Sequence, residues 1–156
     1  MYLISHRGNI NGKKPELENS PEYIDKAIDL GYDVEIDIRL ENDKFYLGHD
    51  NAKYYITLEW LTKRSNKLWI HCKNISAVEA LANLKNFNYF WHQTDDITLT
   101  SKSFIWAYPG KQPIKQSIAV LPEINNDNII GCSGVCSDII EEYNESSFMP
   151  IRNSRL

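Results

Sequence analysis

The sequence predicts a compact parallel β/α barrel of the (β/α)8 TIM-like type, with several outer helices missing or shortened. Eight short β-rich runs recur along the chain. Polar side chains directly follow several of these runs, as expected at the active face of a parallel barrel. Helical patterns separate some of the runs. The runs are Tyr2–Ser5, Asp33–Ile38, Phe45–Gly48, Leu68–Cys72, Tyr89–Trp91, Phe104–Ala107, Ile118–Leu121 and Gly134–Ser137.

Three segments carry the features of a helix start. Ser20 is a typical N-cap before a proline, and Gly31 is placed to end the helix that follows. Thr57 is expected to begin a shorter helix. A capping box over Ser76–Glu79 predicts a third helix with an apolar face.

Chain length limits this architecture. A barrel of this type usually takes about 250 residues, with about 200 as the ordinary lower end. This chain has 156 residues, and the gap between Ile38 and Phe45 is too short for a helix. We therefore expect one domain over residues 1–156, with some helices reduced to turns; the alternative is an open α/β sheet of fewer strands.

Composition excludes several classes of partner. The formal net charge of -4, with no basic run, argues against a nucleic-acid partner or an electrostatic grip on anionic lipid. Three cysteines, an odd number, favour a reducing compartment over a disulfide framework. No signal-peptide pattern or long apolar run is present, so a cytoplasmic location without membrane insertion is expected. A thin outer layer would leave apolar strand surface exposed, which predicts a homo-oligomer.

Two carboxylates share one face of the second predicted strand. Alternation places Val34, Ile36 and Ile38 on one side and Glu35 with Asp37 on the other. Paired carboxylates repel each other and lose hydration on burial unless positive charge lies between them. A divalent cation with oxygen ligands meets that need. The alternative is an edge strand whose polar face is solvated.

Four short motifs occur in order between residues 5 and 50. Together they resemble the glycerophosphodiester phosphodiesterase family, part of the wider group of phospholipase C-like phosphodiesterase barrels. That family has His-Arg-Gly after the first strand, Glu-Asn before the first helix, Glu-x-Asp on the second strand and His-Asp after the third. Beyond residue 75 the likeness is mainly architectural. The corresponding residues here are His6-Arg7-Gly8, Glu18-Asn19, Glu35-Ile36-Asp37 and His49-Asp50.

The fourth strand departs from the family pattern. The family carries Glu-x-Lys there, whereas this chain has His71 in place of the Glu and keeps Lys73. The resemblance implies that Glu35 and Asp37 hold Mg²⁺ or Ca²⁺; an imidazole ligand from His71 would also suit Mn²⁺ or Zn²⁺. Glu123 is a candidate for a compensating carboxylate ligand. Alternatively, His71 hydrogen-bonds a ligand carboxylate from outside.

The resemblance also implies a reaction, the metal-dependent hydrolysis of a phosphodiester such as a glycerophosphodiester. Arg7 and Lys73 would bind the substrate phosphate, and Glu18 would orient Arg7. His6 and His49 would act as an acid/base pair. The attacking group would be a neighbouring hydroxyl of the substrate, which gives a cyclic phosphate that water then opens.

Two rival functions fit the same residues. One is a phosphodiester transfer of the phospholipase D-like kind, which resembles this pattern in its histidines and its Glu-x-Asp motif. The other is a non-catalytic barrel that binds a phosphate compound. Two further polar positions are open in role: His92 either lines the mouth of the barrel or is structural, and Asp138 is a candidate cap after the last strand.

Overall fold

The computed structural model describes residues 1–144 of the chain. Its strands are β1 (Tyr2–His6), β2 (Asp33–Glu41), β3 (Lys44–Leu47), β4 (Tyr54–Ile56), β5 (Leu68–Cys72), β6 (Asn88–Phe90), β7 (Ile97–Leu99), β8 (Ile105–Ala107), β9 (Ser117–Val120) and β10 (Gly134–Ser137). Its helices are α1 (Pro21–Asp29), α2 (Leu58–Lys63) and α3 (Ile75–Asn83), with short 3-10 turns η1 (Pro122–Ile124) and η2 (Ile140–Tyr143).

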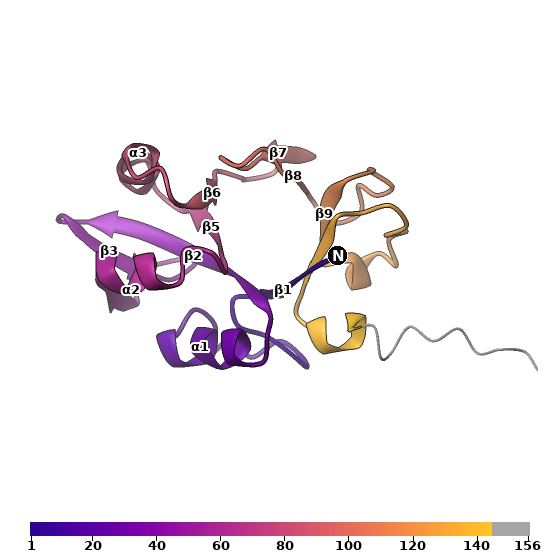
Figure 1. Cartoon of the computed structure of the whole chain (residues 1–156), viewed down its shortest axis with the longest axis horizontal. Helices are drawn as coiled ribbons and strands as arrows, with labels where there is room; N and C mark the ends of the chain where they lie inside the picture. The colour runs from indigo at the N-terminus through magenta and orange to yellow at the C-terminus, as the bar shows by residue number, and fades with distance from the viewer. Residues whose placement is uncertain (145–156) are drawn as a thin grey trace, which may run out of the picture.

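All ten strands belong to one curled sheet (Figure 1). Its parallel part has the order β6-β5-β2-β1-β10-β9-β8. Three antiparallel pairings extend it, which are β3 on β2, β4 on β3 and β7 on β8. Strand β2 is the junction of this sheet, because it pairs with β1, β3 and β5.

The prediction of a parallel (β/α)8 TIM-like barrel is wrong. The sheet is mixed and curls into a half-barrel, and residues 1–144 contain three α-helices, too few to surround it. The run at Phe45 returns antiparallel to β2, because Asn42 and Asp43, with φ of 49° and 59°, form a tight hairpin turn. No strand ladder joins β6 to β8 within the described residues. Their contact is made by side chains, with the rings of Phe90 and Trp106 4.6 Å apart.

The sequence predicted the individual strands and helix caps more reliably than the overall architecture. Each of the eight β-rich runs contains a strand, whereas β4 and β7 were not predicted. The predicted caps at Ser20 and Thr57 are confirmed, since each side chain accepts a hydrogen bond from the helix it begins. The capping box at Ser76–Glu79 is wrong. Helix α3 begins two residues earlier, with Asn74 as its N-cap, because the Asn74 side chain accepts a hydrogen bond from the backbone N–H of Ala77.

The two faces of the sheet have different contents. The convex face, with Val34, Ile36 and Ile38, packs against α1, α2 and α3 in the larger apolar core. The concave face carries a second apolar layer, to which every parallel strand except β2 contributes one side chain; these are Ile4, Trp69, Phe90, Trp106, Ile118 and Cys136. Two positions further along five of these strands, on the same face, the side chains are His6, His71, His92, Tyr108 and Asp138. Strand alternation therefore builds a largely polar layer above an apolar floor.

Two expectations concern the surface. Within residues 1–144 no helix has the length and apolar character needed to cross a membrane. Strand β7 exposes Ile97 and Leu99, in the region where an interface between copies was expected. The homo-oligomer stays a prediction.

The convex face of β2 provides a test of the packing. Ile36 is fully buried there, so Ile36→Ala should lower the free energy of unfolding by about 2–5 kcal/mol, and Ile36→Val by about 0.5–1.5 kcal/mol. Ile130 is 83% exposed, so Ile130→Ala should change it by no more than about 0.5 kcal/mol. Urea denaturation measures all three. Equal costs at the two isoleucines would contradict the assignment of faces in β2.

Candidate active site

A cavity of about 940 Å³ opens at the carboxyl ends of the parallel strands. The chain has four histidines, and all of them line this cavity. They come from distant parts of the sequence and are His6, His49, His71 and His92. Arg7, Lys13 and Lys73 add positive charge to the same wall. The curl of the sheet thus gathers nearly every polar group that the sequence analysis singled out.

Among the described residues, Glu35, Asp37 and His71 are a group whose side chains could hold a metal ion; we call it the ligand cluster. One potential ligand atom of each lies within 4.8 Å of the others. Nδ1 of His71 is 3.7 Å from Oε1 of Glu35 and 3.4 Å from Oδ1 of Asp37. The pairing of β2 with β5 causes this proximity, because it sets Asp37 directly opposite His71.

The orientation of the His71 ring decides what it offers. Its Nε2 is 2.8 Å from the carbonyl oxygen of His92, which can only accept a hydrogen bond. Nε2 therefore carries the proton, and in the neutral ring Nδ1 presents a lone pair to the two carboxylates. Those contacts are longer than ordinary hydrogen bonds of 2.7–3.2 Å. Three electron-rich groups facing one another need a cation or a proton between them.

Two oxygens of the ligand cluster lack partners. Glu35 Oε2 and Asp37 Oδ1 are buried and accept no hydrogen bond from the described residues. Buried polar atoms nearly always have a partner, so these orphaned oxygens are evidence for a bound group. Two carboxylate oxygens and one imidazole nitrogen fit Mg²⁺ or Ca²⁺ with added water ligands, and fit Mn²⁺ or Zn²⁺ well.

The two carboxylates carry charge unequally. Burial, followed by the charge of Asp37, raises the pKa of Glu35 above its ordinary value. Burial also acts to raise the pKa of Asp37, but the interaction with His71, the charge of Arg7 and the hydrogen bond from Asn19 outweigh it and leave this pKa well below its usual range. Glu35 therefore holds a proton more tightly than Asp37. A divalent cation bound here would displace that proton.

Arg7 is fixed beside the ligand cluster. Its Nε lies 2.8 Å from Asp37 Oδ2, an ion-pair distance without hydrogen-bond alignment. Its Nη1 donates to Glu18 Oε2 at 3.2 Å, which is the orienting contact expected of Glu18. The next residue, Gly8, has φ of 93°, and a Cβ there would lie 2.6 Å from Tyr23 Cδ1. Only glycine fits this close turn after β1.

Asn19 has a definite role that its motif alone did not reveal. Its Nδ2 donates to Asp37 Oδ2 at 2.9 Å, and its Oδ1 accepts from the backbone N–H of Asp37 at the same distance. The side chain is held in place by a left-handed backbone, with φ of 63°. Asn19 therefore orients the lower-pKa carboxylate of the ligand cluster.

His6 is paired with Asp138, which the sequence suggested only as a helix cap. His6 Nδ1 is 2.7 Å from Asp138 Oδ1, and Nε2 is 3.8 Å from Glu35 Oε2. Asn9 donates to Asp138 and to Glu18, which fixes both acids. Burial lowers the pKa of His6, but the hydrogen bond that its Nδ1 donates to Asp138 and the charge of Glu35 outweigh it, so the pKa is raised. The sequence held one signal for this pairing: strand alternation places Asp138 on the same face as Cys136.

His49 lies at the opposite side of the ligand cluster and is half-exposed. Its Nδ1 is 2.7 Å from Asp50 Oδ1, and its Nε2 is 3.4 Å from Nζ of Lys73. The ammonium of Lys73 only donates, so Nε2 accepts and carries no proton in this arrangement. Arg39 holds the loop through the carbonyl oxygens of Gly48 and His49, at 3.2 and 2.7 Å.

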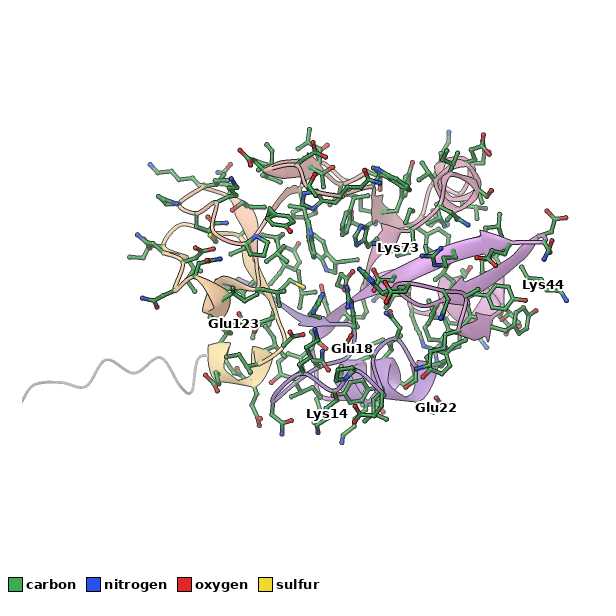
Figure 2. The ribbon with its side chains drawn as sticks, turned by 180° about the vertical axis from the view of Figure 1, so that it is seen from behind. Lys14, Glu18, Glu22, Lys44, Lys73 and Glu123 are labelled. Carbon is green, nitrogen blue, oxygen red and sulfur yellow. The ribbon has the colours of Figure 1, made fainter. Side chains whose placement is uncertain are left out.

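Glu123 is placed apart from the ligand cluster. Its Oε1 accepts hydrogen bonds from Ser137 Oγ at 2.8 Å and from the backbone N–H of Asp138 at 3.2 Å. Figure 2 shows that Lys73 comes from the β5 side of the sheet and Glu123 from the β9 side. Glu123 thus supports the loop of Asp138. The sequence analysis considered it a candidate ligand, but the structure does not bring it to the ligand cluster.

The raised pKa of Glu35 predicts a pH-dependent stability in the presence of a chelator. Stability from its protonated form is fully present below the unfolded pKa of about 4.3 and is lost as pH rises through the higher folded value. The side chain in Glu35→Gln stays neutral at every pH. The free energy of unfolding of this variant, relative to that of the wild type, should therefore increase as pH rises. Denaturation of both proteins between about pH 4 and pH 8 tests this. A difference that did not vary with pH would contradict the raised pKa.

The orientation of His71 predicts metal preference. With imidazole in place of carboxylate, the site has one negative charge fewer, so His71→Glu should tighten Mg²⁺ and Ca²⁺ binding more than Mn²⁺ or Zn²⁺ binding. Calorimetric titration with each ion measures the change. His71→Gln is the matched control, because it lacks the added charge. If His71 instead stood outside the ligands, His71→Glu would destabilise the fold without any gain in affinity.

Comparison of the chain with protein-family models, with curated proteins and with solved structures gave no match. The likeness to glycerophosphodiester phosphodiesterases therefore rests on the four sequence motifs alone.

Proposed function

We propose that this protein is a metal-dependent phosphodiesterase, a phosphoric diester hydrolase that resembles the glycerophosphodiester phosphodiesterases. One observation carries the proposal: two oriented histidines, His6 and His49, line the same cavity as Glu35 and His71 of the ligand cluster. Their Nδ1 atoms are each 2.7 Å from a carboxylate, which leaves Nε2 of each ring for proton transfer. A glycerophosphodiester is the substrate type that the motifs favour.

Substrate phosphate would be bound by cations that the fold keeps close to the ligand cluster. Arg7 is held rigidly by two acids, so its guanidinium is preorganised rather than mobile. Nζ of Lys73 lies 3.4 Å from Nε2 of His49, the ring nitrogen that carries no proton. A phosphate oxygen is a stronger acceptor than that nitrogen, and we expect it to take over the ammonium when substrate binds. Phosphate binding would then leave His49 Nε2 free.

A divalent cation held by the ligand cluster supplies positive charge that polarises the phosphodiester and offsets the charge of its transition state. The protein's own part is to hold the two carboxylates and Nδ1 of His71 in place. Asn19 and Arg7 fix Asp37, and the carbonyl oxygen of His92 fixes the His71 ring. Two of the three ligands, Asp37 and His71, are thereby oriented by a second residue, as in efficient metal sites.

The two histidines have distinct roles in this proposal. Nε2 of His49 carries no proton and accepts one from the attacking hydroxyl of the substrate. His6, whose pKa is raised beside Asp138, donates its proton to the leaving alcohol oxygen. The P–O bond to the leaving group breaks as the new P–O bond forms, which gives a cyclic phosphate and an alcohol. Water then opens the cyclic phosphate, with the two rings exchanging roles.

Turnover of bis(p-nitrophenyl) phosphate tests the proposal. It should require Mg²⁺, Ca²⁺ or Mn²⁺, stop in EDTA and be lost in a Glu35→Gln, Asp37→Asn double variant. His6→Ala and His49→Ala should fold normally yet lose about 10²–10⁴-fold in turnover. The wild type should show a bell-shaped dependence of turnover on pH, and each variant should lose one limb of that curve.

Controls separate chemistry from folding. Lys73→Ala should raise KM, whereas Lys44→Ala should not, because Lys44 lies at the outer end of β3, away from the cavity (Figure 2). Turnover that survives EDTA or the double variant would refute metal dependence. Full activity in either histidine variant would remove that residue from the mechanism.

A further inference from the structure

The cavity has a second wall that the proposed chemistry does not use. Its residues lie within or shortly after β8 and β9, across the cavity from the ligand cluster. We call this the apolar wall. Its members are Trp106, Tyr108, Pro109, Val120, Leu121 and Ile124.

Charge is kept away from the apolar wall. Glu123 is the acid of η1, but it turns toward Ser137 and Asp138 and does not line the cavity. Lys111, on the adjacent loop, is paired with Asp96 at 2.8 Å. Of the described residues in 106–124, those that line the cavity carry no ionised side chain. The wall is therefore suited to an apolar group, in contrast to the cationic wall opposite.

Two residues of the apolar wall show signs of constraint. Leu121 adopts a left-handed backbone conformation, with φ of 46°, and its N–H donates to the carbonyl oxygen of Cys136 at 2.7 Å. A bulky residue rarely takes this conformation, and such outliers concentrate at functional sites. Ile124, which also lines the cavity, is 64% exposed. Both apolar side chains are thus held at the cavity in contact with solvent.

The size of the cavity points the same way. Pockets of about 300–1,000 Å³ enclose most of a drug-sized molecule, and this one is close to the upper end of that range. A phosphodiester with two small polar alcohols would leave the side chains of the apolar wall in contact with water. An apolar substituent would displace that water favourably.

We infer that the preferred substrate is a phosphodiester with one apolar arm, an alkyl chain or an aromatic ring, that packs on the apolar wall. The inference rests on the proposed function, because it assumes that the phosphate lies at the ligand cluster. The edge-to-face contact of Tyr108 with His92, with centroids 5.6 Å apart, joins the two walls. One molecule can therefore contact both walls.

Calorimetry with Mn²⁺ present and three simple diesters tests the inference. The probes are dimethyl phosphate, methyl hexyl phosphate and methyl phenyl phosphate. Burial of each methylene strengthens binding by about fourfold, so the hexyl or the phenyl diester should bind at least about tenfold more tightly than dimethyl phosphate. A gain for hexyl alone would identify an alkyl arm, and a gain for phenyl alone an aromatic arm.

Variants locate the effect. Ile124→Asn should remove most of the gain and leave the affinity for dimethyl phosphate unchanged. Leu121→Gly should do the same, and glycine suits the left-handed backbone there, so the fold should be kept. Ile130→Asn is the matched control, because Ile130 is exposed and does not line the cavity. It should keep the full gain.

The outcomes separate the two proposals. Dimethyl phosphate binding with no gain for either larger diester, or a gain that survives both wall variants, would overturn the inference and leave the phosphodiesterase proposal standing. Failure of all three diesters to bind in the presence of Mn²⁺ would overturn both.

Discussion

The site depends on one constraint, the burial of two carboxylates on the same face of a central strand. Glu35 is 2% exposed and Asp37 is fully buried, although each loses hydration and repels the other. The alternate residues Val34, Ile36 and Ile38 pack beneath the helices on the other face and prevent the strand from turning its acids outward. The energy of the apolar core thus holds an arrangement that electrostatics alone would disperse.

The neighbours of the two acids relieve this repulsion unequally. The carboxylate of Asp37 accepts a hydrogen bond from Asn19 and has the guanidinium of Arg7 beside it. Glu35 has the rings of His6 and His71 at 3.8 and 3.7 Å, beyond ordinary hydrogen-bond range, and one of its oxygens is orphaned. One carboxylate is therefore compensated by the protein and the other is not. The uncompensated charge is what a cation from solution would balance.

Much of this site was predictable because its causes are local. Alternation in residues 33–38 fixed the faces of β2, and the short motifs identified Arg7 and Glu18 as a pair. The partners that were missed come from distant segments: Asp138 lies 132 positions from His6, and His92 lies 21 from His71. The architecture was missed for a different reason, a local turn. Two residues with positive φ turn β3 back along β2, and their effect on strand direction outweighs the β-rich pattern of the run that follows.

The distribution of helices agrees with the division of the cavity into two walls. Figure 1 shows α1, α2 and α3 outside the part of the sheet that includes β2 and β5, the strands of the ligand cluster. Ligand geometry must be held within a fraction of an ångström, which requires a packed layer behind those strands. Residues 97–120, with β7, β8 and β9, form no α-helix, and this part of the sheet supplies the apolar wall. Apolar contact tolerates small displacements, so a thin, helix-free side of the sheet is sufficient for it. A chain of 156 residues thereby places its rigid packing behind the groups whose positions matter most.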